Sequence, residues 1–284
     1  MALRKRRSPD GLSPLSLARR PSGGVHRHCE AARFLVFICR LSCQCRRYSK
    51  ASGPGSIIRN FSQCSGMVME AIEAATVVID TIVQMAGEAR PLMQRVLPPA
   101  GVHWWAHYPD DDARDKKTRS RWYYHIHPPG MRDPDEHGHF HLFLHRTQLD
   151  AASEPLAVPA EGEAAPAHVA HVAGLSVDHD GVPRAWFATN RWVTDEFLYP
   201  AETMIAHLDR YNVDNTEEDD LVNRLLTAMV ALYRCELAGL LRARDAALAE
   251  LVKAGGAAAY EAGNDILAIC PIDLDAKIGG LGLD

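Results

Sequence analysis

The feature that most constrains the fold is the segment EHGHFHLFLH, residues 136–145, in which histidines alternate with large apolar residues. Successive side chains of a β-strand point to opposite faces, so this period of two predicts a strand with one apolar face and one histidine-rich face. The apolar face carries Phe140, Leu142 and Leu144. Such a strand belongs in a sheet whose apolar side is covered by other elements.

A partner strand is predicted just before it. Residues 122–127, WYYHIH, have the aromatic and β-branched composition of a strand, and the Pro-, Gly- and Asp-rich residues between the two segments favour turns. Residues 121–145 are therefore predicted to form a hairpin. If odd positions lie opposite odd positions, one face presents five histidines, as two facing pairs and a neighbour: His125, His127, His137, His139 and His141.

A second hairpin is predicted over residues 171–190, with its turn at residues 179–181. Apolar residues at helical spacing predict a helix over residues 69–96, which Pro91 should kink or end. Everything after the second hairpin is predicted to be helical.

Two C-terminal helices are expected: a short one over residues 200–211, and a long one from a capping box at Thr216 to Gly255-Gly256. The predicted class is α+β, a small antiparallel sheet of two hairpins with N- and C-terminal helices packed on one face.

Charge divides the chain into two parts. Residues 1–66 hold 13 Lys and Arg against 2 Asp and Glu, and the rest carries a net charge of −16. We expect residues 1–66 to be a disordered basic extension and residues 67–284 to be a single globular α+β domain. The extension has three explanations: a targeting peptide, a basic tail for nucleic acid or an anionic surface, or translated upstream sequence before a natural start at Met67 or Met69. The last is favoured.

Several classes of protein are not expected. No apolar run approaches the ~20 residues that a membrane helix needs, so no membrane partner is predicted. Cys235 and Cys270 are the only cysteines after residue 66, too few for a disulfide framework, which indicates a reduced, cytoplasmic protein. The acidic domain is not expected to bind nucleic acid, and a small-molecule ligand is the partner that the histidine face favours.

The histidine face has the chemistry of a metal site. Residues i and i+2 of a strand lie roughly 6.6 Å apart, close enough for two imidazoles to lean onto one metal ion. We therefore predict one divalent metal, Zn or Fe/Mn, with the five histidines as ligands. His139 and Glu136 are the predicted catalytic residues, provided that the strand starts after Glu136 and frees its carboxylate. His103 and His107 would approach if Trp104-Trp105 turned as a helix.

A plainer explanation is that these histidines are polar residues that tolerate partial burial. What favours ligation is their density, since eight of the chain's 14 histidines fall within residues 103–145. Two substrate-binding residues are predicted, His107 and Arg191. Arg191 follows the last predicted strand and could clamp a carboxylate or phosphate. The alternative is an ion pair in a strand-to-helix connection, with Trp192 filling the core.

The run HGHFHLF, residues 137–143, resembles the histidine-triad motif of nucleotide hydrolases and transferases. That resemblance implies that the middle histidine, His139, attacks a phosphorus atom without a metal. Gly138 stands where the motif has an apolar residue.

A broader resemblance covers most of residues 101–275. The segments HWWAHYP, WYYHIHP, EHGHFHLFL, HVAGLSVDHDGVPRAWFATNRWVTDE and LVNRLLTAMV are similar to an uncharacterised bacterial family, a domain of unknown function, and imply no activity. Three functions stay open: a metal-dependent enzyme, a histidine-triad-like nucleotide hydrolase or transferase, and a non-enzymatic domain that binds a ligand or partner. The sequence does not decide whether the chain is an enzyme.

Overall fold

The computed structural model describes residues 55–261 and 263–283. The chain divides into two units, Met1–Arg59 and Asn60–Asp284, and the fold given below is that of the second. Most of the predicted basic extension, residues 1–54, lies outside the described residues. Helix α2 (Gly55–Gly87) begins before Met67, and the domain boundary predicted there stays a prediction.

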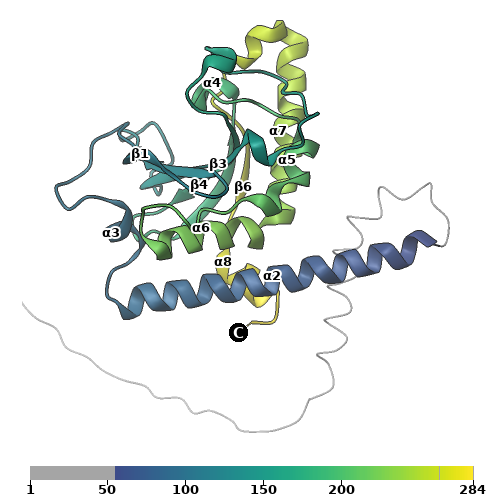
Figure 1. The fold of residues 1–284 in the computed structure, drawn as a ribbon. Helices are drawn as coiled ribbons and strands as arrows, with labels where there is room; N and C mark the ends of the chain where they lie inside the picture. The colour runs from purple at the N-terminus through teal and green to yellow at the C-terminus, as the bar shows by residue number, and fades with distance from the viewer. Residues whose placement is uncertain (1–54, 262, 284) are drawn as a thin grey trace, which may run out of the picture. The chain divides into compact units, whose positions relative to one another are not determined.

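A six-stranded antiparallel sheet forms the centre of this unit, with its strands in the order β1-β2-β3-β4-β5-β6 (Figure 1). The strands are β1 (Tyr108–Arg114), β2 (Arg121–His125), β3 (Gly138–His145), β4 (Val169–Val177), β5 (Pro183–Thr189) and β6 (Ile266–Pro271). Chain order and sheet order coincide, although β6 pairs with β5 only after the chain has passed through the C-terminal helices. With helices on this sheet, the predicted α+β class is confirmed.

The sheet is larger than the sequence predicts. Pairs β2–β3 and β4–β5 join the segments expected as hairpins, but β1 and β6 were not predicted. The prediction that everything after the second hairpin is helical is wrong at β6. Both missed strands are sheet edges, with irregular burial and no clean alternation of apolar and polar residues, so a period of two does not reveal them.

The remaining α-helices are α3 (Leu92–Val96), α4 (Arg191–Thr194), α5 (Ala201–Ala206), α6 (Asp220–Leu232), α7 (Arg234–Gly255) and α8 (Leu274–Gly279). Short 3-10 turns occupy η2 (Arg146–Gln148), η3 (Gly162–Ala164), η4 (Leu208–Arg210) and η5 (Gly256–Tyr260). None of the described helices combines the length and apolar composition needed to cross a bilayer.

Three predicted helices are divided in the structure. The short one expected over residues 200–211 is α5 followed by the 3-10 turn η4. The helix expected over residues 69–96 ends at Gly87, and α3 starts after Pro91. The long C-terminal helix is two helices, α6 and α7, because Tyr233 leaves helical geometry with φ −100° and ψ 20°. Its N-cap is Asp219, whose side chain accepts from the backbone N–H of Leu221, rather than Thr216. The apolar spacing runs through the break, so periodicity alone does not mark it.

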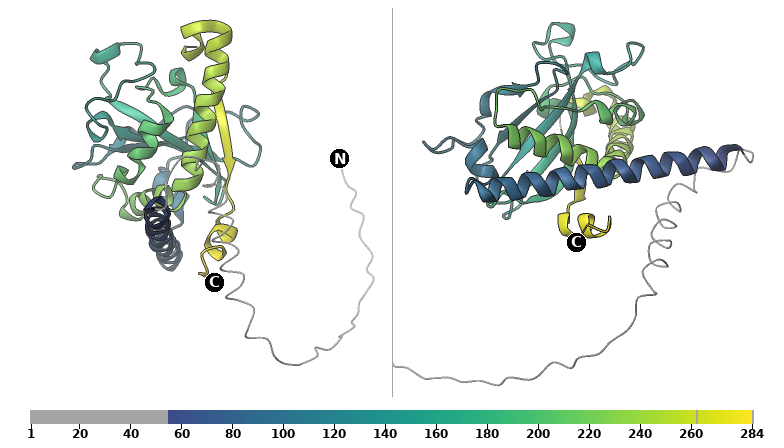
Figure 2. Two further views of the ribbon diagram at one scale, coloured as in Figure 1. Left: turned by 90° about the vertical axis from the view of Figure 1, so that its right-hand side faces the viewer. Right: turned by 60° about the horizontal axis from the view of Figure 1, so that its bottom comes forward.

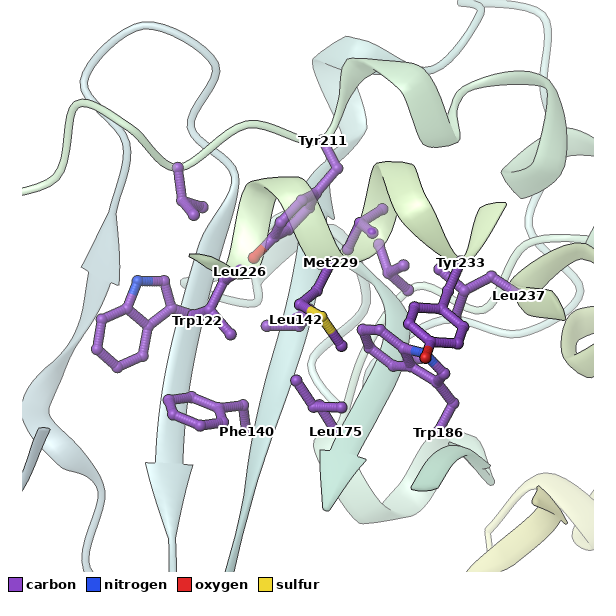
Figure 3. Close-up of a cluster of buried hydrophobic side chains, with 14 of the residues drawn as sticks. Trp122, Phe140, Leu142, Leu175, Trp186, Tyr211, Leu226, Met229, Tyr233 and Leu237 are labelled. Carbon is purple, nitrogen blue, oxygen red and sulfur yellow. The ribbon is translucent and has the colours of Figure 1, made fainter. Parts of the chain in front are cut away.

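The even positions of β2 and β3 face the helices. Figure 3 shows this core, in which strand side chains such as Trp122, Phe140 and Leu142 meet Leu226 and Met229 of α6. At its edge the buried Trp122 Nε1 donates a hydrogen bond to Asn223 Oδ1 of α6 at 2.9 Å. Helix α7 runs alongside β6 (Figure 2). Because the helices cover the even positions, the odd positions point to the opposite face of the sheet.

Candidate metal centre

Pairing between β2 and β3 puts odd positions opposite odd positions. His125 lies opposite His139, and Tyr123 lies opposite His141. The histidine face therefore forms as the alternation predicts, but with one facing pair of histidines instead of two. The second pair does not form because β2 ends at His125 and β3 begins at Gly138, which leaves His127 and His137 beyond the paired residues.

Three histidines converge on one point. His125, His139 and His141 each offer a ring nitrogen, and these three atoms lie within 4.8 Å of one another. The Nε2 atoms of His125 and His139 are 2.6 Å apart. His139 and His141 are each 1% exposed, whereas His125 is partly exposed at the rim. Two of the three side chains are therefore closed to solvent, and the third is partly exposed.

Glu136 orients His139 from behind. Its Oε1 lies 2.7 Å from His139 Nδ1, and Arg132 Nε donates to the same oxygen at 3.1 Å. The carboxylate can reach this position because β3 starts after Glu136, so strand alternation does not send its side chain to the other face. Histidine ligands of metals usually donate their second ring N–H to such a carboxylate, which fixes the tautomer and aims Nε2 at the metal.

His171 holds His141 in the same way. Its Nε2 lies 2.9 Å from His141 Nδ1, and its own Nδ1 lies 3.1 Å from Thr189 Oγ1. A bulge in the β3–β4 ladder, where Val172 is the extra residue, puts His171 on the histidine face. The backbone N–H of His171 donates to the buried carboxyl group of Glu196.

Sequence reasoning missed His171 and Thr189. The one available signal was that His171 opens the second predicted hairpin. The pairing of β3 with β4 and its bulge, which bring His171 to His141, leave no trace in the sequence pattern.

Burial sets the protonation states of this cluster. It lowers the pKa of His125 to about 2, with the neighbouring His139, His127 and His107 adding to the effect, and lowers that of His171 to about 3. The pKa values of His139 and His141 are lowered for the same main reason.

Glu136 has the opposite balance. Burial raises its pKa, but the hydrogen bond to His139 and the charge of Arg132 outweigh that effect and bring the pKa to about 2. Neutral imidazoles beside a charged carboxylate are the states that metal binding requires.

His127 lies beside the three-histidine group without joining it. Its ring centroid is 4.8 Å from that of His125 and 5.1 Å from that of His139, and the edge of Trp105 lies against it at 4.3 Å. Its Nδ1 is buried and has no hydrogen-bond partner among the described residues. The residues around it do not form the helix that would bring His103 and His107 in as ligands, since Trp105 sits in a turn with φ 68°.

The structure brings two other predicted residues near the face but not to the group. His137 turns away, with its Nδ1 2.6 Å from the hydroxyl of Tyr124. His107 stacks on Tyr123 with ring centroids 3.8 Å apart, and its Nδ1 is 3.5 Å from Asp112. Both therefore already have partners within the protein.

Arg191 is placed at the end of β5, as the first residue of α4. Its guanidinium is 2.5 Å from Asp195 Oδ1 and also pairs with Glu261. This is the ion pair that the sequence offered as the alternative to a substrate clamp. Trp192, expected to fill the core, is 39% exposed, because α4 is a short surface helix.

The environment of His139 bears on its proposed role as a nucleophile. Its Nε2 faces His125 and its Nδ1 faces Glu136, so both ring nitrogens are engaged and the side chain is buried. A histidine ring that is held at both nitrogens is better suited to bind a metal ion than to act as a nucleophile. A nucleophile needs a free ring nitrogen that can approach a phosphorus atom in line with the bond that breaks.

Gly138, the departure from the histidine-triad motif, has a steric cause. A Cβ at this position would lie 2.4 Å from the Tyr124 hydroxyl oxygen and 2.5 Å from the backbone oxygen of His125. No side chain fits there without moving the strand that carries the candidate ligand.

Gly138→Ala is accordingly expected to destabilise the chain by about 2 kcal/mol or more, as overpacking of a closed site does. Gly239→Ala is the matched control, because a Cβ at this position meets nothing within 4 Å. Gly239 lies inside α7, where replacing glycine by alanine should raise the free energy of unfolding by up to about 1 kcal/mol. Chemical denaturation of both variants measures the difference. Equal unfolding free energies would contradict the close approach of β2 and β3 at this position.

Comparison with known proteins adds the family. The model of a domain of unknown function, DUF6969, matches residues 72–272, which include the three histidines and both residues that orient them. No curated protein and no solved structure matches the chain significantly. The match covers more than half of the chain, so the protein belongs to the DUF6969 family of domains of unknown function.

Proposed function

We propose that this chain binds one zinc ion through His125, His139 and His141 and uses it to hydrolyse a small molecule. The observation that carries the proposal is the group of three histidine ring nitrogens within 4.8 Å of one another. Two of these rings, those of His139 and His141, are oriented by hydrogen bonds at Nδ1. With Nδ1 of His139 and His141 engaged, the Nε2 lone pairs are left for a metal.

Shifts of the ring nitrogens of up to about 1.5 Å separate this arrangement from a tetrahedral site. Zinc–nitrogen bonds of about 2.0–2.1 Å put two ligand nitrogens roughly 3.3 Å apart. The Nε2 atoms of His125 and His139 are 2.6 Å apart, the distance of a shared hydrogen. Replacing that hydrogen by zinc requires His125 to withdraw by less than 1 Å, and His125 is the member at the partly open rim.

The donor set favours zinc over iron or manganese. All three candidate ligands are imidazoles, whereas the iron sites of many oxygenases use two histidines and one carboxylate on the metal. The nearest carboxylate, Glu136, has its Oε1 on His139 and on Arg132, so it orients a ligand instead of acting as one.

Three protein ligands leave a fourth position for water or substrate, and zinc lowers the pKa of a bound water to about 7. A pocket of about 550 Å³ is lined by Glu136 and Phe187, two residues that contact His139, although none of the three histidines lines it. The ring of Phe187 is 5.0 Å from that of His139 and 5.7 Å from that of His141. The contacts of Glu136 and Phe187 with His139 connect this pocket to the group, which supports hydrolysis of a small molecule held there.

Elemental analysis of the untagged chain is the decisive test. We expect one zinc per chain after purification, and a thermal midpoint that falls when a strong chelator removes the metal and recovers when zinc is returned. No first-row metal at stoichiometric level would contradict the metal site. Stoichiometric iron or manganese would contradict the identity of the ion. A zinc-loaded chain that turns over no ester, amide or phosphoester substrate would contradict the hydrolytic role and leave a binding domain.

A further inference from the structure

The opposite end of the histidine face carries a second unusual cluster, made of arginines. Arg114 of β1 and Arg121 of β2 lie directly opposite each other in the antiparallel ladder. Like charges in directly opposed positions destabilise a sheet. Arg121 is only 5% exposed, so its charge is not relieved by water.

The acidic groups nearby do not neutralise this cluster. Asp112 Oδ2 lies 3.3 Å from Arg121 Nη1, but the same carboxylate also pairs with His107. Arg121 Nε is buried and has no hydrogen-bond partner among the described residues. Arg114 and Arg119 have no acidic partner in the described part of the chain. The other carboxylates of this stretch, Asp110, Asp111 and Asp115, form no ion pair with these arginines among the described residues, and Asp115 accepts from backbone N–H groups instead.

Two histidines extend the same cationic field. His145 ends β3, and its ring stacks with that of His168 at 6.4 Å between centroids. Burial lowers the pKa of His145 to about 4, and Arg119, Arg121, His168 and Arg114 each lower it further. Four positive or potentially positive groups thus act on one side chain.

A hollow lies beside His145, and Arg114, Arg119 and Arg121 are not among its lining residues. Its volume is about 240 Å³, and its lining includes His145, Arg146, Thr147, Ser153, His168 and Tyr199. The acid in the wall, Asp150, has Oδ1 3.1 Å from His207 Nε2 and is already paired. The guanidinium of Arg146 already donates to Tyr199 and pairs with Glu163, so the hollow adds the imidazoles of His145 and His168, which are the groups here that could donate to an oxyanion.

We propose that this end of the sheet is a binding site for a phosphate-type dianion, held by Arg114, Arg119 and Arg121 beside His145 and His168. The planar guanidinium matches two oxygens of a phosphate at once, and a dianion removes the repulsion between the facing arginines.

This site is separate from the candidate zinc ligands. Arg121 and His125 are four residues apart in β2, roughly 13 Å along the strand, so one phosphate cannot touch both. The aromatic residues Tyr123 and Phe143 fill the space between them and are buried. The inference therefore goes beyond the proposed hydrolysis and does not depend on it.

Titration calorimetry with inorganic phosphate tests the proposal on the full chain, at pH 7, low ionic strength and with a chelator present. We expect saturable binding, and Arg114→Gln and Arg119→Gln should each raise Kd about tenfold, the loss of one charge-assisted contact. Both side chains are exposed, so these variants should fold. Arg90→Gln is the control, since Arg90 is an exposed arginine that pairs with Asp219, and its Kd should not change.

The arms of the experiment separate the sources of any signal. Phosphate binding that is seen without the chelator and lost with it would place the phosphate on a metal ion. Binding that neither Arg114→Gln nor Arg119→Gln weakens would place it elsewhere on the chain. Either result, or the absence of binding heat, would overturn the proposal. Acetate in place of phosphate should bind at least tenfold more weakly, because a monoanion meets fewer of these donors. Acetate binding as tight as phosphate would overturn the assignment to a dianion.

Discussion

His139→Ala is expected to abolish stoichiometric zinc binding, the largest single effect that the site predicts. His139 occupies the centre of the group, facing His125 through Nε2 and Glu136 through Nδ1. Its removal leaves two imidazoles from different strands, too few for a zinc site that normally takes three or four protein ligands. Competition with a chromophoric chelator measures the change, and a loss of affinity of more than a thousandfold is expected.

The residues behind the ligands should have smaller, graded effects. Glu136→Gln and His171→Gln each remove an orienting partner without removing a ligand, and losses of 10–100-fold in zinc affinity are typical of such changes. His137→Ala is the matched control: it deletes a histidine of the same alternating row whose Nδ1 lies against the Tyr124 hydroxyl, outside the group. Its zinc affinity should equal that of the unmodified chain.

The pattern of the series distinguishes a built site from a histidine-rich surface. On a surface that gathers metal loosely, any histidine of the row contributes and His137→Ala would cost as much as His139→Ala. Equal losses for the two variants, or zinc binding that survives His139→Ala, would therefore contradict the assignment of His125, His139 and His141 as ligands. Circular dichroism of each variant separates loss of binding from loss of fold, because His139 is buried.

The sequence predicted the face of this site because alternation is a local property. Parity alone assigns His125, His139 and His141 to one side and Phe140 and Leu142 to the other, and the β2–β3 register keeps that assignment. Which of the five histidines converge depends on where the strands end. Strand β2 ends at His125. The sequence does not mark this end, because residues of strand-like composition continue to His127.

Long-range pairing was out of reach of the sequence. His171 meets His141 only because β3 pairs with β4 and a bulge at Val172 shifts the register by one residue. The arginine cluster has the same origin, since Arg114 belongs to an edge strand whose acidic sequence, YPDDDAR, has no strand pattern. Both features arise from contacts between segments whose individual compositions are unremarkable, so neither a motif nor a period reveals them.

The metal-free chain is expected to be most stable near pH 6.5 and to lose several kcal/mol by pH 4.5. His171 has a pKa of about 3 in the folded state against 6.5 in the unfolded state. As pH falls below 6.5, the unfolded chain takes up this proton first, so the free energy of unfolding decreases until the folded pKa is reached. Two pH units below 6.5 correspond to about 3 kcal/mol for this one residue. His125, His139 and His141 act in the same direction.

Glu196 produces the decline on the alkaline side. Burial raises its pKa to about 8, although Arg244 and the His171 N–H act against the shift. Between 4.5 and 8 the unfolded chain has lost this proton while the folded chain retains it, so rising pH favours unfolding and costs about 2 kcal/mol from pH 6.5 to 8. Below pH 6.5 the titration of Glu196 raises the free energy of unfolding as pH falls, whereas the histidines lower it. The effect of the four imidazoles exceeds that of the one carboxyl group.

Denaturation with urea across pH 4.5 to 9, with a chelator present, measures both arms. Glu196→Gln keeps an oxygen for the His171 N–H and removes the titration, so it should flatten the alkaline arm and leave the acid arm in place. His171→Gln should reduce the acid slope by about 1.4 kcal/mol per pH unit, the share of one proton. Glu250→Gln changes an exposed carboxyl near Lys253 and should leave the profile unaltered. An acid arm of unchanged slope in His171→Gln would mean that His171 is not held neutral by burial, and the support it gives to His141 as a zinc ligand would fail with it.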